Sequence, residues 1–314
     1  VIGNSVFSSC SNVAFNLSPT NNPPNTIVPA GISYSWPSPT VNGGMLGANI
    51  GNAQASVTGT LSNPTSSAQT AIYAITPSII ATGCTGVPFN LTVTINPTPV
   101  ITNVNLPICS GSPFSVSPNN NPPSQIVPSG TLYAWSAPSV TGGITGGSAQ
   151  VNQAAIAQTL TNPTNLPQTA TYTVTPTSGA AGSCAGATFT VVVTVNPTPL
   201  IPTQNVIACS GSSFTSNLQN ALPNTIIPAG TTYTWGNPVV TGGITGASAQ
   251  INQANISQTL TNPSNIQQTA TYLVTPTSGA AGSCQGANFT LVVTINPIPS
   301  IPAQNSSVCS GLNF

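Results

Sequence analysis

Cysteine is the only residue type in this sequence whose chemistry and spacing together suggest a defined role. The intervals between cysteines alternate between 74 or 75 residues and 25 residues. Regular spacing of this kind favours disulfides in a secreted protein. Zinc would need four ligands close together, and no C-x-x-C pair is present. Free buried thiols are the alternative for a cytosolic chain. The candidates are Cys10, Cys84, Cys109, Cys184, Cys209, Cys284 and Cys309.

Other site chemistry is largely excluded by composition, because none of the 314 residues is Lys, Arg, Asp, Glu or His. General acid–base catalysis, an activated serine and carboxylate-bound calcium or magnesium all need these side chains. Contacts to nucleic-acid phosphate and to anionic lipid need Lys or Arg. We therefore expect no enzyme activity, no cofactor, no metal and no nucleic-acid partner. No apolar run approaches the roughly 18 residues of a membrane span, so we expect no membrane insertion in this segment.

A period of about 100 residues organises the whole chain. Each unit contains a C-S-[GN] motif, a Y-x-W motif, an L-[TS]-N-P motif, a Y-x-[VI]-T-P segment, a second cysteine and a closing N-P-x-P. The sequence predicts an N-terminally incomplete repeat 1 over residues 1–97, repeat 2 over 98–197 and repeat 3 over 198–297. Residues 298–314 are predicted to open a truncated fourth repeat.

Each repeat reads as β-structure. In residues 189–196, Phe189, Val191, Val193 and Val195 alternate with mostly polar residues, as in a half-buried strand. Pro and Gly clusters bound such runs, and no helical period is visible. Roughly seven short strands and an early Trp per 100 residues predict tandem immunoglobulin-like β-sandwiches in a linear array, joined by short, stiff proline linkers.

Aromatic residues recur at the same positions in every unit, which favours a role in the core over a ligand-stacking surface. Tyr172 is also a candidate for a tyrosine corner, in which the hydroxyl bonds to backbone a few residues upstream. The predicted core aromatics are Trp36, Trp135, Trp235, Tyr73, Tyr172 and Tyr272.

The cysteine pairing stays open between two schemes. The within-repeat scheme gives Cys10–Cys84, Cys109–Cys184 and Cys209–Cys284. In a sandwich, however, C-S-G lies at the turn between the first two strands, A and B, and the second cysteine lies in the loop between the last two, F and G. These sites are at opposite ends of a domain, about 26 Å apart along an eight-residue strand. A staggered scheme, with Cys10–Cys184 and Cys109–Cys284, joins ends that face each other in a linear array. A third option, Cys84–Cys109, does not bring its two ends together.

These motifs, together with the V-T-V-N-P-x-P close at residues 193–199, resemble PKD-like repeats of very large surface proteins of Bacteroidetes. Repeats of that family are usually richer in Asp and Lys than this chain. The family includes giant gliding-motility adhesins of the SprB type, which are exported by the type IX secretion system. The resemblance implies an immunoglobulin-like fold, an extracellular location on a bacterial cell surface and a part in adhesion.

Near-copy domains without catalytic groups are typical of a structural stalk, and the resemblance implies that such a stalk acts in gliding motility or surface attachment. The alternative function is a carbohydrate- or protein-binding module of a secreted surface protein. The expected partners are the neighbouring repeats of the same chain, with external surfaces or polysaccharide as further candidates. Because no side chain titrates between about pH 4 and 8, we expect stability to be nearly independent of salt and pH over that range.

Overall fold

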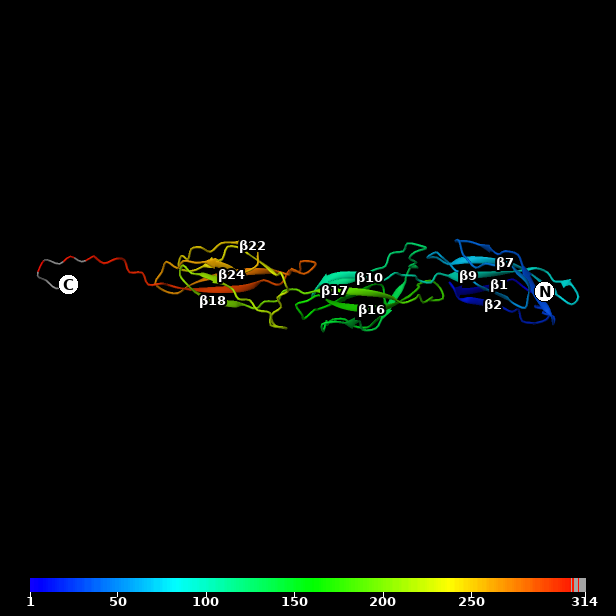
Figure 1. Ribbon diagram of the computed structural model, residues 1–314. Coiled ribbons are helices and arrows are strands. Elements are labelled where there is room, and N and C mark those ends of the chain that lie inside the picture. Colours follow the sequence, from blue (N-terminus) through cyan, green and yellow to red (C-terminus); the bar gives the residue numbers. More distant parts are fainter. Residues whose placement is uncertain (306, 308–309, 311–314) are drawn as a thin grey trace.

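The structure is a computed structural model that describes residues 1–305, 307 and 310. Every regular element in that part of the chain is a β-strand, so the fold is all-β, as the sequence predicts. Three domains follow one another in a line, from repeat 1 at one end to repeat 3 at the other (Figure 1). Among the described residues there is no helix long and apolar enough to cross a membrane.

Repeat 2 shows the architecture of one domain. Its larger sheet has the strand order β10-β17-β16-β12-β14, with the short strand β13 also paired to β16, and its smaller sheet pairs β11 with β15. The strands are β10 (Val104–Cys109), β11 (Pro113–Val116), β12 (Leu132–Trp135), β13 (Ser139–Val140), β14 (Gln150–Gln153), β15 (Ile156–Thr159), β16 (Gln168–Thr177) and β17 (Phe189–Asn196).

Repeats 1 and 3 have the same topology. Repeat 1 consists of β1 (Ser5–Cys10), β2 (Ala14–Leu17), β3 (Ile32–Trp36), β4 (Thr40–Val41), β5 (Gly51–Gln54), β6 (Val57–Thr60), β7 (Gln69–Ile79), β8 (Cys84–Thr85) and β9 (Phe89–Asn96). Repeat 3 consists of β18 (Gln204–Cys209), β19 (Ser213–Thr215), β20 (Thr232–Trp235), β21 (Val239–Val240), β22 (Gln250–Gln253), β23 (Ser257–Thr259), β24 (Gln268–Thr277) and β25 (Phe289–Asn296). The extra strand β8 pairs with β7.

The first and last strands of each domain run in parallel. In repeat 2 the pairing of β10 with β17 extends from Val104 opposite Val191 to Cys109 opposite Asn196. The pairs β1–β9 and β18–β25 have the same arrangement. Consequently the turn after the first strand lies at the same end of the domain as the exit of the last strand. This is the end that leads into the next repeat.

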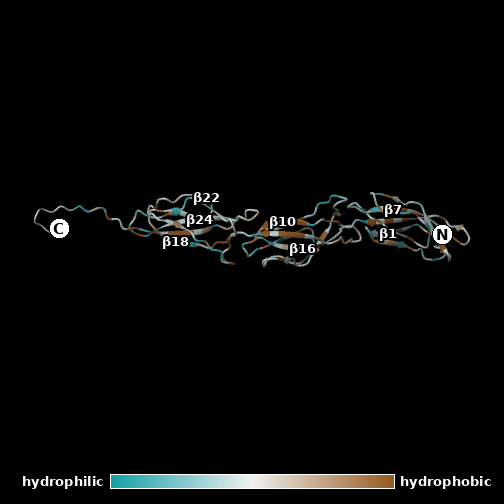
Figure 2. Cartoon of the chain, viewed as in Figure 1, coloured by the Kyte–Doolittle hydropathy of each residue, from teal (hydrophilic) through white to brown (hydrophobic). Residues whose placement is uncertain are grey.

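The two sheets enclose one apolar core in each repeat. On β17, Phe189, Val191, Val193 and Val195 are all buried, because alternate residues of a strand face the same side. Hydrophobic colour concentrates on such strands in Figure 2, whereas the connections are mostly pale or hydrophilic. The six predicted core aromatics, Trp36, Trp135, Trp235, Tyr73, Tyr172 and Tyr272, all lie in these cores.

Two buried aromatic side chains of repeat 2 also satisfy their polar atoms. The indole N–H of Trp135 donates to the Ser148 carbonyl at 3.0 Å. The Tyr172 hydroxyl donates to Oε1 of Gln158 on β15 at 2.8 Å, which links the larger sheet to the smaller one. The tyrosine-corner prediction was therefore wrong. The partner is a side chain across the sandwich, because the fully buried ring points its hydroxyl at the opposite sheet.

Candidate functional site at the repeat junctions

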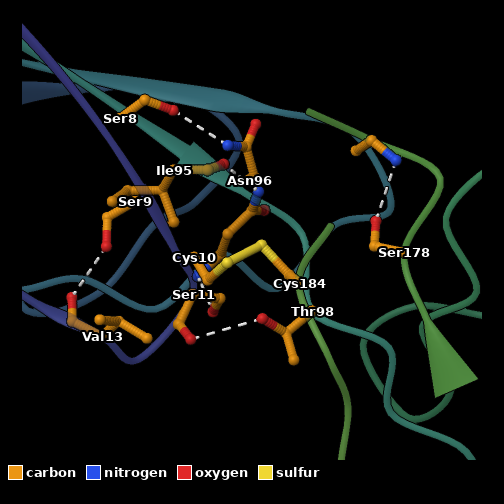
Figure 3. Close-up of a disulfide and its surroundings, with 12 residues drawn as sticks. Ser8, Ser9, Cys10, Ser11, Val13, Ile95, Asn96, Thr98, Ser178 and Cys184 are labelled. Carbon is orange, nitrogen blue, oxygen red and sulfur yellow. Dashed lines mark hydrogen bonds between the residues drawn. A yellow bond between two sulfur atoms is a disulfide. The ribbon is translucent and has the colours of Figure 1, made fainter. Parts of the chain in front are cut away.

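Two disulfides join consecutive repeats. Cys10 of repeat 1 is bonded to Cys184 of repeat 2, and Cys109 of repeat 2 is bonded to Cys284 of repeat 3. Their Cα atoms are 5.6 Å and 5.5 Å apart, well inside the range that a disulfide allows. Figure 3 shows the first bond beside Asn96 and Thr98, where the chain leaves repeat 1. The structure thus has the staggered pairing.

The parallel pairing of first and last strands places these cysteines. Cys10 is the last residue of β1 and lies opposite Asn96, the last residue of β9. The sulfur therefore stands at the exit of repeat 1, where the linker begins. Cys184 belongs to the F–G loop between β16 and β17, at the opposite end of repeat 2. In a line of domains, that loop faces the exit of the repeat before it (Figure 1).

None of the within-repeat pairs Cys10–Cys84, Cys109–Cys184 and Cys209–Cys284 is formed. In repeat 2 the eight-residue strand β17 separates the two sites by about 26 Å, far beyond the reach of a disulfide. Cys84–Cys109 is not formed either. Cys84 and Cys209 are free and exposed. Cys309 lies outside the described residues.

Hydrogen bonds accompany the covalent link. The Ser11 amide donates to the Asn96 carbonyl at 2.9 Å, and the Thr198 hydroxyl of the second linker donates to the Ser110 carbonyl at 3.1 Å. Between repeats 1 and 2, Nδ2 of Asn120 donates to Oγ of Ser66 at 2.9 Å. The first two bonds hold the end of the repeat and the linker against the turn that carries the bonded cysteine, and the third joins a loop of repeat 2 to a loop of repeat 1. The junctions are therefore fixed by more than the disulfide.

The F–G loop fits closely against the preceding repeat. Gly182 and Ser183, just before Cys184, have positive φ angles of 88° and 45°. A side chain at Gly182 would begin 3.1 Å from Nδ2 of Asn96 in repeat 1. A side chain at Gly186 would meet the carbonyl oxygen of the linker residue Pro99. Glycine at both positions therefore allows the loop and linker to approach.

A buried asparagine supports each exit, and the sequence analysis gave it no role. Nδ2 of Asn162 donates to the carbonyls of Val195 at 2.9 Å and Leu166 at 2.8 Å. The backbone N–H of Asn162 donates to Oγ of Ser110 at 2.9 Å. Asn162 thus ties the end of β17 to the turn beside Cys109. Asn63 and Asn262 make the same contacts. The recurrence of Asn-Pro in every repeat was the available signal.

The chemistry of the site is structural. The part of the chain that the structure describes holds no group of three or more His, Cys, Asp or Glu side chains suited to a metal ion. Burial raises the pKa of Tyr73 and Tyr172 to about 12, so both phenols stay protonated near neutral pH. What the arrangement does is fix one domain to the next, by a peptide linker and a disulfide at each junction.

The comparison with protein families matches this repeat pattern. A model described as "PKD-like domain" matches residues 8–99, 101–199 and 203–299. The chain belongs to the PKD-like domain family. Three tandem PKD-like domains thus account for most of the sequence. No curated protein sequence matches the chain significantly.

Solved structures with a similar arrangement are tandem β-domain proteins of low sequence identity. The three N-terminal domains of the bacteriophage RB49 highly immunogenic outer capsid protein are 12% identical, with a TM-score of 0.37, covering 92% of this chain and 96% of that one. Chicken CNTN1 FN1–FN3 is 11% identical, with a TM-score of 0.32 and coverages of 94% and 99%. Mouse PcdhgC3 EC1–3 is 10% identical, with a TM-score of 0.27 and coverages of 74% and 77%.

Proposed function

We propose that this chain is part of an extracellular stalk: a series of PKD-like domains that extends a large, repetitive adhesin from a bacterial cell surface. The observation that carries the proposal is the covalent joining of consecutive repeats, end to end, by Cys10–Cys184 and Cys109–Cys284. A disulfide parallel to each linker restricts bending between domains, and a projecting stalk needs that restriction. Disulfides also persist mainly in oxidising, extracellular compartments.

The surface composition supports the same role. A chain with no charged side chain presents Ser, Thr, Asn and Gln to solvent. Screening by salt acts on charges, so the contacts of this surface with neighbouring domains should change little with ionic strength. The absence of trypsin sites also suits a filament that is exposed to proteases. Within the stalk proposal, the resemblance to SprB-type proteins favours gliding motility or surface attachment, with export by the type IX system.

Small-angle X-ray scattering on the 314-residue chain tests the stalk proposal. We expect one elongated particle whose maximum dimension stays constant from low to high salt and shortens or broadens when the disulfides are reduced. A broad distribution of shapes in the oxidised chain would contradict a stiff stalk.

A glycan array on the same sample tests the alternative function. We expect no preferred ligand. Tight binding of one glycan would instead support the carbohydrate-binding module.

A further inference from the structure

Backbone and disulfides together connect the two junctions by three covalent routes. Junction 1–2 is defined here by the Cys10–Cys184 bond and junction 2–3 by the Cys109–Cys284 bond. Residues 10–109 connect the two bonds, and so do residues 109–184 and residues 184–284. This follows from the stagger, because each disulfide closes a loop that overlaps the other. Within-repeat pairs would close three separate loops and give one route.

In repeat 2, the two strands that run the length of the domain are attached at both ends. Strand β10 follows the linker from repeat 1 and ends at Cys109, which is bonded to repeat 3. Strand β17 follows the loop that holds Cys184, which is bonded to repeat 1, and ends at the linker to repeat 3. The two strands are parallel neighbours. Both therefore span from junction 1–2 to junction 2–3 side by side.

This arrangement changes which bonds resist tension. With backbone connections alone, a pull on the array would enter repeat 2 at the start of β10 and leave at the end of β17. It would then shear the hydrogen bonds between those strands. With both disulfides in place, each strand is pulled from its own two ends. As long as repeats 1 and 3 stay folded, covalent bonds along β10 and β17 then carry the tension across repeat 2, and the hydrogen bonds between the two strands are not sheared.

Repeats 1 and 3 lack one attachment each within this chain. Cys84 occupies in repeat 1 the position that Cys184 has in repeat 2, and Cys209 occupies in repeat 3 the position of Cys109. Both thiols are free. Repeat 2 is therefore the fully attached domain, and its neighbours serve as internal references.

We infer that the staggered disulfides make the array of repeats a redundant tension-carrying element. The two junctions stay covalently joined when the backbone is cut on any one of the three routes, and also when it is cut on any two. The mechanical use of this redundancy rests on the proposed stalk function, whereas the redundancy itself rests on the disulfide pairing. A stalk exposed to shear and to proteases would keep its two ends connected after local damage.

The absence of Lys and Arg makes a cleavage test unusually clean, because one introduced lysine is the only trypsin site. Asn25→Lys, Ser124→Lys and Asn224→Lys place that site at exposed, equivalent positions of the loop after the second strand. Each falls on a different route. The chain is folded, its free thiols are blocked, and trypsin is added in urea without reductant. The unsubstituted chain is the control and should stay uncut.

The expected result is that each single variant, and each double variant, is cut but keeps its N-terminal and C-terminal ends in one species until reductant is added. The triple variant should separate the two ends without reductant, since all three routes are then broken. Separation of the ends in any single variant would overturn the inference. A triple variant whose N-terminal and C-terminal ends stay joined without reductant would also overturn it, because within-repeat disulfides would bridge all three cuts.

Single-molecule pulling tests the mechanical part, with the full chain held by peptide tags at its two termini. At roughly 3.5 Å per residue, the shortest covalent path limits the oxidised chain to about 400 Å, against about 1,100 Å after reduction. We also expect repeat 2 to resist forces that unfold the repeats of the reduced chain. Cys84→Ser with Cys209→Ser should change neither result. Cys10→Ser with Cys184→Ser should lower the force at which repeat 2 extends.

A different outcome would contradict the tension-carrying role without touching the stalk proposal. If repeat 2 of the fully oxidised chain lengthened at the force that unfolds the reduced repeats, the hydrogen bonds would be carrying the tension after all. Scattering from the same sample would still report the shape of the array. The two failures are therefore distinguishable.

Discussion

The N-terminal ends of repeats 1 and 2 have nearly the same sequence pattern but different surroundings. Cys84 is exposed, whereas its counterpart Cys184 is buried and bonded. Ile27 is 47% exposed, and the equivalent Ile126 is 5% exposed. Beside Cys84, an apolar pocket of about 190 Å³ is lined by residues that include Pro77, Gly86 and Val87.

Part of the difference comes from the linker. In repeat 2 the Pro99 carbonyl lies against Gly186, whereas the atoms nearest to Gly86 in repeat 1 belong to Pro77 of its own domain. The F–G loop of repeat 1 is also one residue shorter and forms strand β8. The comparison teaches that a repeat does not cover this end by itself. Contact with the preceding repeat buries the cysteine of this loop.

Removing the bonded cysteine at the N-terminal end of repeat 2 should give the largest effect, in contrast to removing the free cysteine at the same end of repeat 1. Cys184→Ser opens a loop of 174 residues, which the chain-entropy model values at about 5 kcal/mol. Cys84→Ser is the matched control and should change stability little, because Cys84 is free and exposed. Urea unfolding with hydrogen exchange read out for each repeat measures both. Equal losses in the two variants would show that the junction bond contributes nothing specific.

Alkaline pH should affect both repeats alike, although their junctions differ. Burial raises the pKa of Tyr73 and Tyr172 from 10.0 to about 12. Between about pH 10 and 12 the unfolded chain has lost these protons and the folded chain still holds them, so stability falls as pH rises. Below pH 10 the contribution is complete. It amounts to about 3 kcal/mol for each buried tyrosine.

Urea midpoints measured from pH 4 to 12, with free thiols blocked, test this window. We expect a flat profile up to about pH 9, because the chain has no carboxylate, imidazole or amine side chain. A midpoint that already drops between pH 5 and 8 would contradict it, as would a decline confined to one repeat.

A methyl group added at the linker contact should weaken only the junction that uses it. The new Cβ of Gly186→Ala would collide with the Pro99 carbonyl oxygen, whereas that of Gly86→Ala comes nearest to the Pro77 ring, at 2.9 Å. Overpacking against backbone costs about 2 kcal/mol. We expect faster hydrogen exchange in the F–G loop of repeat 2 for Gly186→Ala, and a smaller, local change for Gly86→Ala. The same response at both ends would mean that the linker contact is not what orders the loop.

Much of the fold could be predicted from the sequence because its signals are periodic. The alternation of Phe189, Val191, Val193 and Val195 specifies a strand with one buried face, and a period of about 100 residues specifies tandem domains. The spacing of the cysteines could not decide their partners, since 74 or 75 residues fits both schemes. That decision needed the topology of the sandwich, which puts Cys109 and Cys184 at opposite ends of repeat 2.

Other features depend on contacts that a local pattern does not encode. The bond from Tyr172 to Gln158 joins residues of opposite sheets. The Asn162 network joins three segments far apart in sequence. A recurring residue indicated that these positions matter, but the partners follow only from packing.

The smallest expected effect concerns that tyrosine. Tyr172→Phe removes the 2.8 Å bond to Oε1 of Gln158, which then keeps only the Ser148 amide at 3.1 Å. Repeat 1 has Gly59 at the position of Gln158, and no described side chain accepts a hydrogen bond from Tyr73. A net hydrogen bond contributes about 1 kcal/mol, so Tyr172→Phe should lower the unfolding free energy of repeat 2 by that amount. Tyr73→Phe should cost repeat 1 clearly less. If the two substitutions cost the same in local hydrogen exchange, the link between sheets adds nothing to the burial of the ring, and the substitution of Gly for Gln in repeat 1 is energetically neutral.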